Sequence, residues 1–456
     1  MITSLLRTAT MPLLLAAFVC TGHVHAQTWE YFGTDFPSRV RAIATQDDDV
    51  YLGGDFRNVA GNDDMSFVTR WDGSDFHSLG RGVNARVYAV ETAGSNVFVT
   101  GRITEAYNSD GTTVEVAGIA RWDGSEWHAL GSGIDGPNST VGYALEAHDN
   151  TVFVGGDITS AGDIDVNNIA AWDNSTETWA NVGSGLDGLV SALVYNEDED
   201  VLYAGGDFDS TSADLRVNNI AMWNASTWSE MNGGFPEPIH SLSLSETWLW
   251  AGGGSGAAVL SRWDGSAWED MDSGFDGYIS AALAPDDDAL VVSGPFSSAG
   301  GVPAQRLAMN REGEWSELGT LDEAAIDIEL YGDRMVIAGD FQEVNAAVSH
   351  FLVVFTPPDA TATQSEELPP SFALLSNYPN PFNPTTTIHY SLSEAGFVTL
   401  VVTDLLGRQV AEIVSRPKAA GEHSVRFDAR AFPSGTYYYT VHQNGRTITR
   451  SMILAK

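Results

Sequence analysis

Short runs of alternating hydrophobic and polar residues fill the chain from residue 29 to about residue 355, and Asp, Asn and Gly turns separate them. Residues 189–231 show the pattern: "LVSALVYN", "DVLYAGGDF", "NNIAMWN" and "TWSEM" follow one another with short polar breaks. Alternation of this kind predicts short antiparallel strands joined by hairpin turns. No stretch keeps the i, i+3, i+4 spacing of an amphipathic helix, so we expect no helix.

The four-strand pattern recurs with three landmarks in a fixed order. The first is a hydrophobic run that ends in glycine, at Gly54, Gly101, Gly156, Gly206, Gly253, Gly294 and Gly339. The second is "RWDGS" or a relative, at Trp71, Trp122, Trp172, Trp223 and Trp263, then the weaker "AMNREG" (308–313) and "FLVVF" (351–355). The third is an aromatic residue, at Trp29, Phe76, Trp127, Trp179, Trp228, Trp268 and Trp315. The repeat of about 48 residues suits a four-stranded propeller blade.

The two ends of the repeat array are incomplete in complementary ways. The chain opens on the third landmark, Trp29, and the last unit stops after the second landmark, near Phe351. Seven complete units therefore exist only if the strand at Trp29 completes the last one. Such closure removes exposed sheet edges. The sequence predicts an all-β chain with a seven-bladed β-propeller at residues 27–355, closed by its N-terminal strand.

Residues 1–26 have the layout of a secretory signal peptide: Arg7, the apolar run "MPLLLAAFVC" and the small-residue ending "VHA". The only cysteine, Cys20, lies in this segment, so disulfides and thiolate sites are excluded in the mature chain. No later stretch reaches the roughly 20 apolar residues of a membrane helix, so we expect no transmembrane segment.

Charge is distributed unevenly along the chain. Residues 27–368 hold 56 acidic residues against 13 Arg and no Lys, a net charge of −43, whereas residues 369–456 carry 8 basic and 5 acidic residues. A surface this negative repels phosphate backbones, so we expect no nucleic-acid binding. High acidity with Arg in place of Lys favours a saline habitat, where salt screens the repulsion. Binding of divalent cations is the rival explanation.

An aspartate follows the landmark glycine in four units, as Asp55, Asp157, Asp207 and Asp340. Other units carry Arg102, Gly254 and Pro295 at this place. We interpret the aspartates as acceptors of backbone N–H bonds where the strand enters the next loop. The alternative is a carboxylate ring that holds Ca²⁺, which prefers six to eight oxygen ligands.

Enzyme motifs are missing from the sequence. The eight histidines beyond the signal are scattered without metal-binding spacing, and no G-x-S-x-G elbow occurs. No catalytic residue and no cofactor can be assigned. The tryptophans fall in the landmark columns, except Trp250, which replaces a Tyr or Phe, and Trp248, which is off the pattern. The columns indicate packing between strands.

The landmarks resemble kelch-type propeller repeats: a glycine pair closes one strand, and "WDNSTETW" (172–179) supplies two aromatic residues on the next hairpin. The recurring aspartate and the loosened fifth and sixth units depart from the kelch pattern. Kelch-like folds serve both binding modules and oxidases. A kelch-type copper-radical oxidase needs a cysteine, which the mature chain lacks.

A polar, proline-bearing segment at 356–370 predicts a linker, and alternating strands after it predict a small Ig-like β-sandwich at 371–456. "YPNPFNPTTTI" (378–388), "VTDLLGRQV" (402–410), "SGTYYYTV" (434–441) and "MILAK" (452–456) resemble the type A C-terminal sorting domain of the type IX secretion system. The residues that carry the resemblance are Tyr378, Pro379, Asn380, Pro381, Phe382, Gly435 and Tyr437. It implies passage through the periplasm to the cell surface or the medium, with the secretion machinery as a partner. An ordinary adhesion module is the alternative.

We therefore expect a monomeric, secreted or surface-displayed protein for binding or adhesion, with a carbohydrate or another surface molecule as ligand. The segments between the second and third strands vary most, from "GSGA" (254–257) to "ITEAYNSDGTTVEVA" (103–117), and mark the expected binding face. The alternative is an extracellular polysaccharide hydrolase or lyase with a carboxylate site in the propeller channel.

Overall fold

The structure is a computed structural model. It describes residues 28–137, 142–357 and 373–456, apart from 379, 381, 383, 393–395, 404, 406–407, 419–420, 431 and 444–445. The expected signal peptide at 1–26 and all but the first two residues of the expected linker at 356–370 lie outside the described residues. Contacts group Ala26–Pro358 into one compact unit and Asp359–Lys456 into another. Every regular element in the described part of the chain is a β-strand.

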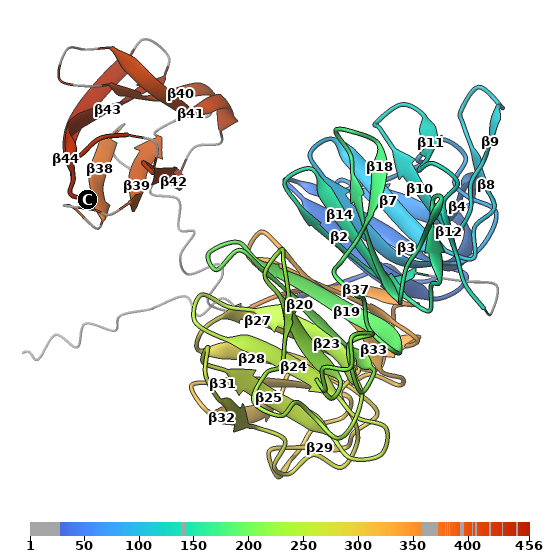
Figure 1. The fold of residues 1–456 in the computed structure, drawn as a ribbon. Coiled ribbons are helices and arrows are strands. Elements are labelled where there is room, and N and C mark those ends of the chain that lie inside the picture. The colour runs from blue at the N-terminus through green and yellow to red at the C-terminus, as the bar shows by residue number, and fades with distance from the viewer. Residues whose placement is uncertain are drawn as a thin grey trace, which may run out of the picture. The chain divides into compact units, whose positions relative to one another are not determined.

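Seven four-stranded antiparallel sheets form the first unit, and we number them in chain order (Figure 1). Sheet 1 holds β2 (Val40–Gln46), β3 (Asp49–Val59), β4 (Asn62–Trp71) and β5 (Phe76–His77). Sheet 2 holds β6 (Val87–Ala93), β7 (Asn96–Gly101), β10 (Ile119–Trp122) and β11 (Trp127–Ala129). Sheet 3 holds β13 (Gly142–His148), β14 (Thr151–Gly156), β17 (Ile169–Asp173) and β18 (Thr178–Asn181). Sheet 4 holds β19 (Leu189–Asn196), β20 (Val201–Asp207), β21 (Ile220–Trp223) and β22 (Trp228–Ser229).

The remaining sheets follow the same order. Sheet 5 holds β23 (Ile239–Leu244), β24 (Leu249–Gly253), β25 (Val259–Trp263) and β26 (Trp268–Asp270). Sheet 6 holds β27 (Ala281–Asp286), β28 (Ala289–Ser293), β31 (Leu307–Arg311) and β32 (Glu314–Glu317). Sheet 7 holds β33 (Ala325–Tyr331), β34 (Arg334–Gly339), β37 (Leu352–Thr356) and β1 (Thr28–Tyr31).

Short hairpins extend several links between second and third strands. They are β8 (Glu105–Tyr107) with β9 (Thr113–Glu115), β15 (Ser160–Ala161) with β16 (Ile164–Asp165) and β12 (Ile134–Asp135), β29 (Ser298–Ala299) with β30 (Val302–Pro303), and β35 (Glu343–Val344) with β36 (Ala347–Val348). These additions account for the variable length that the sequence shows at this place in the repeat.

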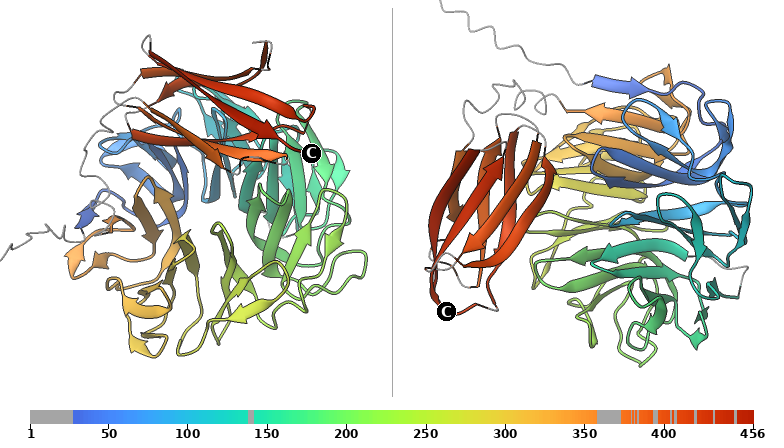
Figure 2. Two further views of the ribbon diagram at one scale, coloured as in Figure 1. Left: turned by 90° about the vertical axis from the view of Figure 1, so that its left-hand side faces the viewer. Right: turned by 90° about the horizontal axis from the view of Figure 1, so that it is seen from above.

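The first strands of the seven sheets lie around a common centre. Each contacts the first strand of the next sheet, and β33 of sheet 7 contacts β2 of sheet 1. The left view of Figure 2 shows the sheets of this unit arranged around an open middle. This is the arrangement of a β-propeller, in which the first strand of each sheet is innermost.

Strand β1 comes from the start of the described chain, yet it forms the outer edge of sheet 7. It pairs antiparallel with β37, in a register that sets Thr28 opposite Thr356 and Tyr31 opposite Val353. Trp29 packs on Phe355, with ring centroids 4.6 Å apart. The two ends of the propeller sequence are therefore joined through one sheet.

Landmark glycines are explained by close approach between strands. A Cβ atom at Gly53 would lie 2.5 Å from Cγ1 of Val87 on the neighbouring sheet, and one at Gly54 would collide with the main-chain carbonyl of Arg39. The same collision with a main-chain carbonyl at or just before the start of the first strand recurs at Gly101, Gly206, Gly253 and Gly294. Only glycine leaves room for the backbone there.

The second unit consists of two sheets. One has the order β38 (Ala373–Tyr378), β39 (Thr385–Leu392), β42 (Gly421–Asp428). The other has the order β41 (Gln409–Lys418), β40 (Gly396–Thr403), β43 (Gly435–Gln443), β44 (Arg446–Leu454). Buried residues from both sheets, among them Ile388, Leu400, Tyr439 and Met452, form one core. The unit therefore has a hydrophobic core of its own.

Candidate functional site in the central cavity

The innermost strands enclose a cavity of about 610 Å³. Its lining comes from the first strands of six sheets and, in sheet 6, from Tyr278 and Ser280, which lie just before β27. The lining also includes Gly254 and Ser255, which belong to the short link after the second strand of sheet 5. One end of the cavity is thus at the face that carries the variable links. A volume of this size falls within the range typical of small-molecule sites.

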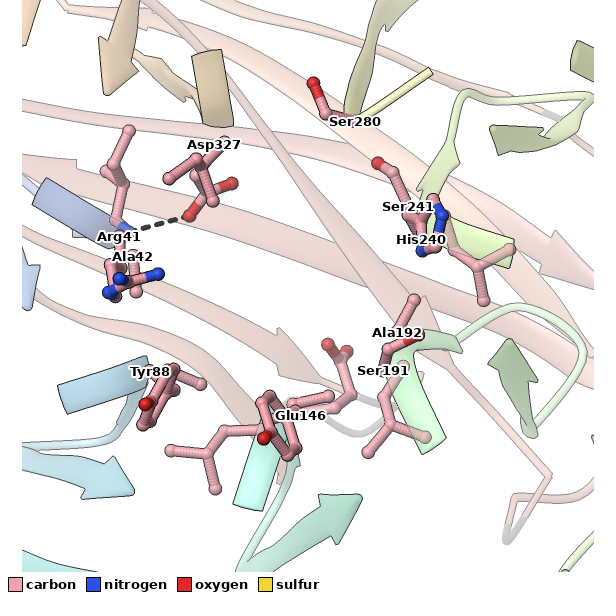
Figure 3. A pocket seen from close by; sticks show the side chains of 18 of the residues that line it. Arg41, Ala42, Tyr88, Glu146, Ser191, Ala192, His240, Ser241, Ser280 and Asp327 are labelled. Atoms are coloured by element: carbon pink, nitrogen blue, oxygen red, sulfur yellow. Dashed lines mark hydrogen bonds between the residues drawn. The ribbon is translucent and has the colours of Figure 1, made fainter. Parts of the chain in front are cut away.

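Aromatic residues and one arginine line the end of the cavity near this face, and we call them the rim: Arg41, Tyr88, Tyr143, His240 and Tyr278. Each of the first four is the second residue of its innermost strand. The rings of Tyr88 and Tyr143 are 5.2 Å apart between centroids, and those of His240 and Tyr278 are 5.9 Å apart. Several rings thus line one opening (Figure 3).

Arg41 is held in place by a bidentate ion pair. Its Nε and Nη2 atoms donate to Oδ1 and Oδ2 of Asp55 at 2.7 and 2.8 Å. The guanidinium lies 5.3 Å from the centroid of the Tyr88 ring. The bond to Asp55 raises the pKa of Arg41 above its ordinary value. Because Asp55 neutralises it, Arg41 adds hydrogen-bonding and stacking capacity to the rim with little free charge.

Four carboxyl groups line the cavity farther along the strands, and we call them the channel carboxyls: Glu91, Glu146, Asp327 and Glu329. Three of them accept a main-chain N–H from a residue that can be named with its distance: Ile43 N to Asp327 Oδ2 is 2.7 Å, Tyr195 N to Glu146 Oε1 is 2.9 Å, and Thr92 N to Glu91 Oε1 is 2.7 Å. Figure 3 shows Asp327 and Glu146 on different sides of the cavity. Two of these bonds join neighbouring sheets: Asp327 of sheet 7 accepts from Ile43 of sheet 1, and Glu146 of sheet 3 accepts from Tyr195 of sheet 4.

The channel carboxyls are protonated more readily than ordinary acids. Burial raises the pKa of Glu91 and Asp327 to about 7, in spite of their backbone hydrogen bonds. Burial, and then the repulsion of neighbouring carboxyls, raises the pKa of Glu146 and Glu329 well above the usual range. No ion pair of the described residues involves any of the four. A cation that entered the cavity would find acidic groups without a positive partner.

Serines along the cavity hold neighbouring sheets together. Ser191 Oγ donates to the carbonyl of Ile239 at 2.8 Å, and Ser280 Oγ donates to the carbonyl of Ala325 at 2.6 Å. The N–H of Ala282 donates to Ser241 Oγ at 3.0 Å. Each bond runs from a side chain of one innermost strand to the backbone of the next. Polar residues in the cavity therefore also have a structural task, since an innermost strand has one unpaired edge.

The repeated aspartates of the sequence lie outside this cavity lining. Asp55 binds Arg41 as described and lies 3.6 Å from Arg86, while Asp340 pairs with Arg39 at 2.6 Å. Their partners are arginines and not the backbone amides that the turn interpretation predicts. The reason is that arginines flank the first residue of two innermost strands. Arg39 and Arg41 flank Val40 of β2, and Arg86 precedes Val87 of β6.

Asp157 and Asp207 occupy the corresponding places in sheets 3 and 4. Among the described residues, no three His, Cys, Asp or Glu side chains are placed so as to hold a metal ion. Calcium binding by Asp55, Asp157, Asp207 and Asp340 stays a prediction.

Sequence reasoning missed the channel carboxyls. They occur in "VYAVETA", "GYALEAH" and "AIDIELY", where an acid interrupts a strand that is otherwise apolar. Aligning the first strands on their opening residues places Glu91, Glu146 and Glu329 at the same position. That coincidence is the signal that could have identified them.

The residues of the predicted sorting motif converge in the second unit. Phe382 is 2 % exposed and pairs with Leu454, and its N–H donates to the carbonyl of Ile453 at 2.9 Å. Asn380 Oδ1 accepts the N–H of Ile453 at 2.9 Å. Gly435 also pairs with Leu454. The terminal "MILAK" is therefore fixed against the "NPF" segment.

The other motif residues are placed as follows. Tyr437 lies in β43 and donates its hydroxyl to the carbonyl of Pro433 at 2.8 Å. Tyr378 ends β38. Pro379 and Pro381 lie outside the described residues.

Comparison with known families agrees with a β-propeller followed by a sorting domain. Residues 143–282 match the family described as the Rax2 C-terminal beta propeller domain, and residues 376–455 match the secretion system C-terminal sorting domain. The second match identifies the C-terminal unit as a type IX secretion sorting domain. The protein is therefore exported to the cell surface or secreted. None of the described segments forms a helix that could cross a membrane.

Individual relatives are distant. Polarized growth protein L1 of a Phoma species is 30% identical over 139 residues, and the match covers 28% of this chain and only 10% of that protein. This chain thus spans about a tenth of that relative.

Two solved structures are similar to this chain at low sequence identity. The WD40 repeats of RRP9 have a TM-score of 0.44 at 10% identity and cover 72% of this chain and 99% of that chain. PorZ, a surface component of the type IX secretion system of Porphyromonas gingivalis, has a TM-score of 0.24 at 12% identity and covers 92% of this chain and 70% of that chain. The predicted kelch resemblance is not among these findings, and the propeller of RRP9 is of the WD40 type.

Proposed function

We propose that this protein is a binding or adhesion protein of the cell surface or the medium, and that its ligand inserts a positively charged group into the central cavity. The observation that carries the proposal is the set of channel carboxyls, which have no cationic partner, beneath a rim of aromatic rings. Aromatic faces and carboxylates together suit an ammonium or guanidinium group. Lysine or arginine side chains and amino sugars supply such groups.

The face around the rim is the proposed binding surface. Ser255 places the opening of the cavity beside the links between second and third strands, and β8 with β9 forms the longest of these links. Side chains on such links can contact the rest of a ligand whose charged end occupies the cavity. The two features would then act on one ligand.

Tetralysine is a suitable probe, measured by isothermal titration calorimetry on the mature chain. We expect the double variant Glu91→Gln, Glu146→Gln to bind it at least about tenfold more weakly, because a bound ammonium group favours the ionised form of these carboxyls and glutamine cannot ionise. The matched control is Asp47→Asn, Asp48→Asn, which removes two carboxylates from an exposed turn. Equal loss in both variants would show unspecific attraction to the acidic surface and would refute the cavity site.

The β8–β9 hairpin tests the binding face. Its base supports the fold, since Arg81 N donates to the carbonyl of Tyr107 at 2.7 Å and Trp127 N donates to Asn108 Oδ1 at 2.7 Å. Only the tip at 109–112 should therefore be replaced by glycines. We expect weaker binding to cells or matrix with an unchanged melting temperature. Unchanged binding would contradict a role of this hairpin.

Hydrolysis or lysis of polysaccharides is the second candidate, and one observation favours it. The pKa of about 7 at Glu91 and Asp327 is what a proton donor at neutral pH needs. Sustained release of reducing ends from a polysaccharide, abolished by Asp327→Asn, would establish it. Absence of release across a panel of polysaccharides would leave the binding function.

We further propose the finer architecture that the sequence predicts: a monomer whose seven sheets are the blades of one ring closed by β1, followed by an Ig-like sandwich that recruits the type IX secretion machinery. The pairing of β1 with β37 supports the closure. The two-sheet order of the second unit supports a sandwich. Sedimentation equilibrium that gives a dimer would contradict the monomer.

A further inference from the structure

Neighbouring sheets of the propeller pack through a repeated aromatic contact. Near the outer end of six of the seven third strands, an aromatic residue packs in the same hydrophobic cluster as a second-strand residue of the preceding sheet. The pairs, preceding sheet first, are Tyr51 with Trp122, Phe98 with Trp172, Phe153 with Trp223, Tyr203 with Trp263, Val291 with Phe355, and Val336 with Trp71. A large ring therefore fills the space between the sheets at six of the seven junctions.

The junction of sheets 5 and 6 lacks this ring. Strand pairing puts Asn310 opposite Leu290 and Trp315, as it puts Trp263 opposite Leu249 and Trp268 in sheet 5. Asn310 thus takes the place of the aromatic residue. On the preceding sheet, Trp250 takes the place of the usual tyrosine or phenylalanine.

A cleft of about 470 Å³ lies at this junction. Trp250, Met271 and Leu290 give it apolar walls, and Asp287, Asp288 and Glu312 give it carboxylates. Arg262 lies on one side but is already paired, since its Nη2 is 2.7 Å from Glu269 Oε2. At the junction of sheets 2 and 3 the corresponding Arg121 instead bridges to Asn174 of the next sheet at 2.7 Å.

Two buried donors in the lining of the cleft have no hydrogen-bond partner. They are the indole N–H of Trp250, which is 3 % exposed, and the Nδ2 amide of Asn310, which is 6 % exposed. The amide oxygen of Asn310 does have a donor, the N–H of Gly313 at 3.0 Å. A buried donor without a partner costs free energy, so a hydrogen-bond acceptor in the cleft would relieve that cost.

We propose that this cleft binds a neutral saccharide unit. A pyranose ring offers hydroxyls that accept hydrogen bonds from Trp250 and Asn310 and donate to the carboxylates of Asp288 and Glu312. Its C–H face packs on aromatic and aliphatic side chains. The carboxylates exclude phosphates, sulfates and uronates by repulsion. The cleft is built from sheets 5 and 6 alone and is independent of the cavity proposed above.

Saturation-transfer NMR on the mature chain tests the site, with the methyl pyranosides of glucose, galactose, mannose and xylose as probes at millimolar concentration. The decisive variant is Asn310→Trp, which introduces the residue that most other sheets carry and fills the cleft. We expect it to fold, to melt no lower than the parent, and to lose the transfer signal. Trp250→Phe keeps the ring and removes the N–H, so we expect about tenfold weaker binding.

Trp29→Phe is the matched control for the loss of an indole N–H. The Nε1 of Trp29 also lacks a partner, but Trp29 does not line the cleft. We expect its saccharide binding to equal that of the parent. Transfer that persists in a folded Asn310→Trp variant, or no transfer from any of the four probes, would overturn the proposal. Transfer to N-acetyltryptophanamide without transfer to any saccharide would also overturn it, since the cleft would then accept an aromatic side chain of a protein partner.

Discussion

Trp127 donates its indole N–H to the main-chain carbonyl of Leu79, 48 residues earlier, at 3.0 Å. The same bond joins Trp179 to Leu130 at 2.9 Å, Trp228 to Val182 at 2.9 Å and Trp268 to Met231 at 2.9 Å. In each case a residue of the fourth strand of one sheet donates to a carbonyl one or two residues after the fourth strand of the preceding sheet. The tryptophan of the third landmark therefore links neighbouring sheets by a hydrogen bond as well as by packing.

Replacing Trp127 by Phe should lower the free energy of unfolding by about 0.5–1.5 kcal/mol through the lost hydrogen bond. The cost stays in this range because the carbonyl of Leu79 keeps a second donor, the N–H of Gly82 at 3.0 Å. Urea unfolding followed by circular dichroism measures the change. Trp29→Phe is the control, since the Nε1 of Trp29 has no partner to lose. Equal destabilisation in both variants would mean that ring size and not the bond matters.

A disulfide between the ends of the propeller should form readily. Thr28 and Thr356 are opposite each other in the register of β1 and β37, and residues 27–456 contain no cysteine that could compete. We expect the oxidised Thr28→Cys, Thr356→Cys variant to be more stable by up to about 5 kcal/mol, because the closed loop is long. A mobility shift on non-reducing gels and the melting temperature report the bond. Failure to oxidise, with Thr28→Cys alone as reference, would contradict the pairing.

Stability should rise on acidification from pH 8 to about pH 5. The native pKa of Glu91 and Asp327, about 7, lies above the unfolded values near 4, so the native state binds more protons in this window and loses stability as pH rises. Melting temperatures across pH 4.5–8 measure the trend. Glu91→Gln with Asp327→Asn should flatten it. A double variant that keeps the parent slope would locate the effect in surface charge instead.

Below that window the aspartates of the hairpin turns should dominate the pH dependence of stability. Backbone and serine hydrogen bonds lower the pKa of Asp173 to about 2, and Asp264 is lowered by the same kind of bonds. Their contribution is present above the unfolded pKa and is lost as pH falls toward the native value. Melting temperatures should therefore decline again below about pH 4. Asp264→Asn should remove part of that decline without changing the slope near neutral pH.

Molar NaCl should raise the melting temperature. Residues 27–368 carry a net charge of −43, and salt screens the repulsion between charges beyond about 3 Å at 1 M. Sodium chloride and choline chloride at equal ionic strength should act alike, because the effect is screening. Stabilisation by micromolar Ca²⁺ at constant ionic strength would instead favour cation binding by the acidic residues.

The sequence predicts the strands well because the repeat supplies the same evidence several times. Gly54 and Trp127 each belong to a column, and a column identifies a strand better than any single segment does. The residues of the candidate site were harder to predict from the sequence. Glu91 and Glu329 are far apart in sequence and become neighbours only because first strands converge, and the partner of Asp55 is an arginine on another strand. Such pairings depend on the twist of each strand, and the alternation of hydrophobic and polar residues does not predict that twist.

The overlap of β1 with sheet 7 has a consequence for evolution. The pairing of β1 with β37 involves only the first and last strands of the propeller, and it does not depend on how many repeats lie between them. If β1 closes the ring as proposed, an in-register duplication or deletion of one repeat would give a wider or narrower ring that still closes and leaves no unpaired sheet edge. Blade number is then a trait that recombination can change in a single event, and the bore of the channel would change with it.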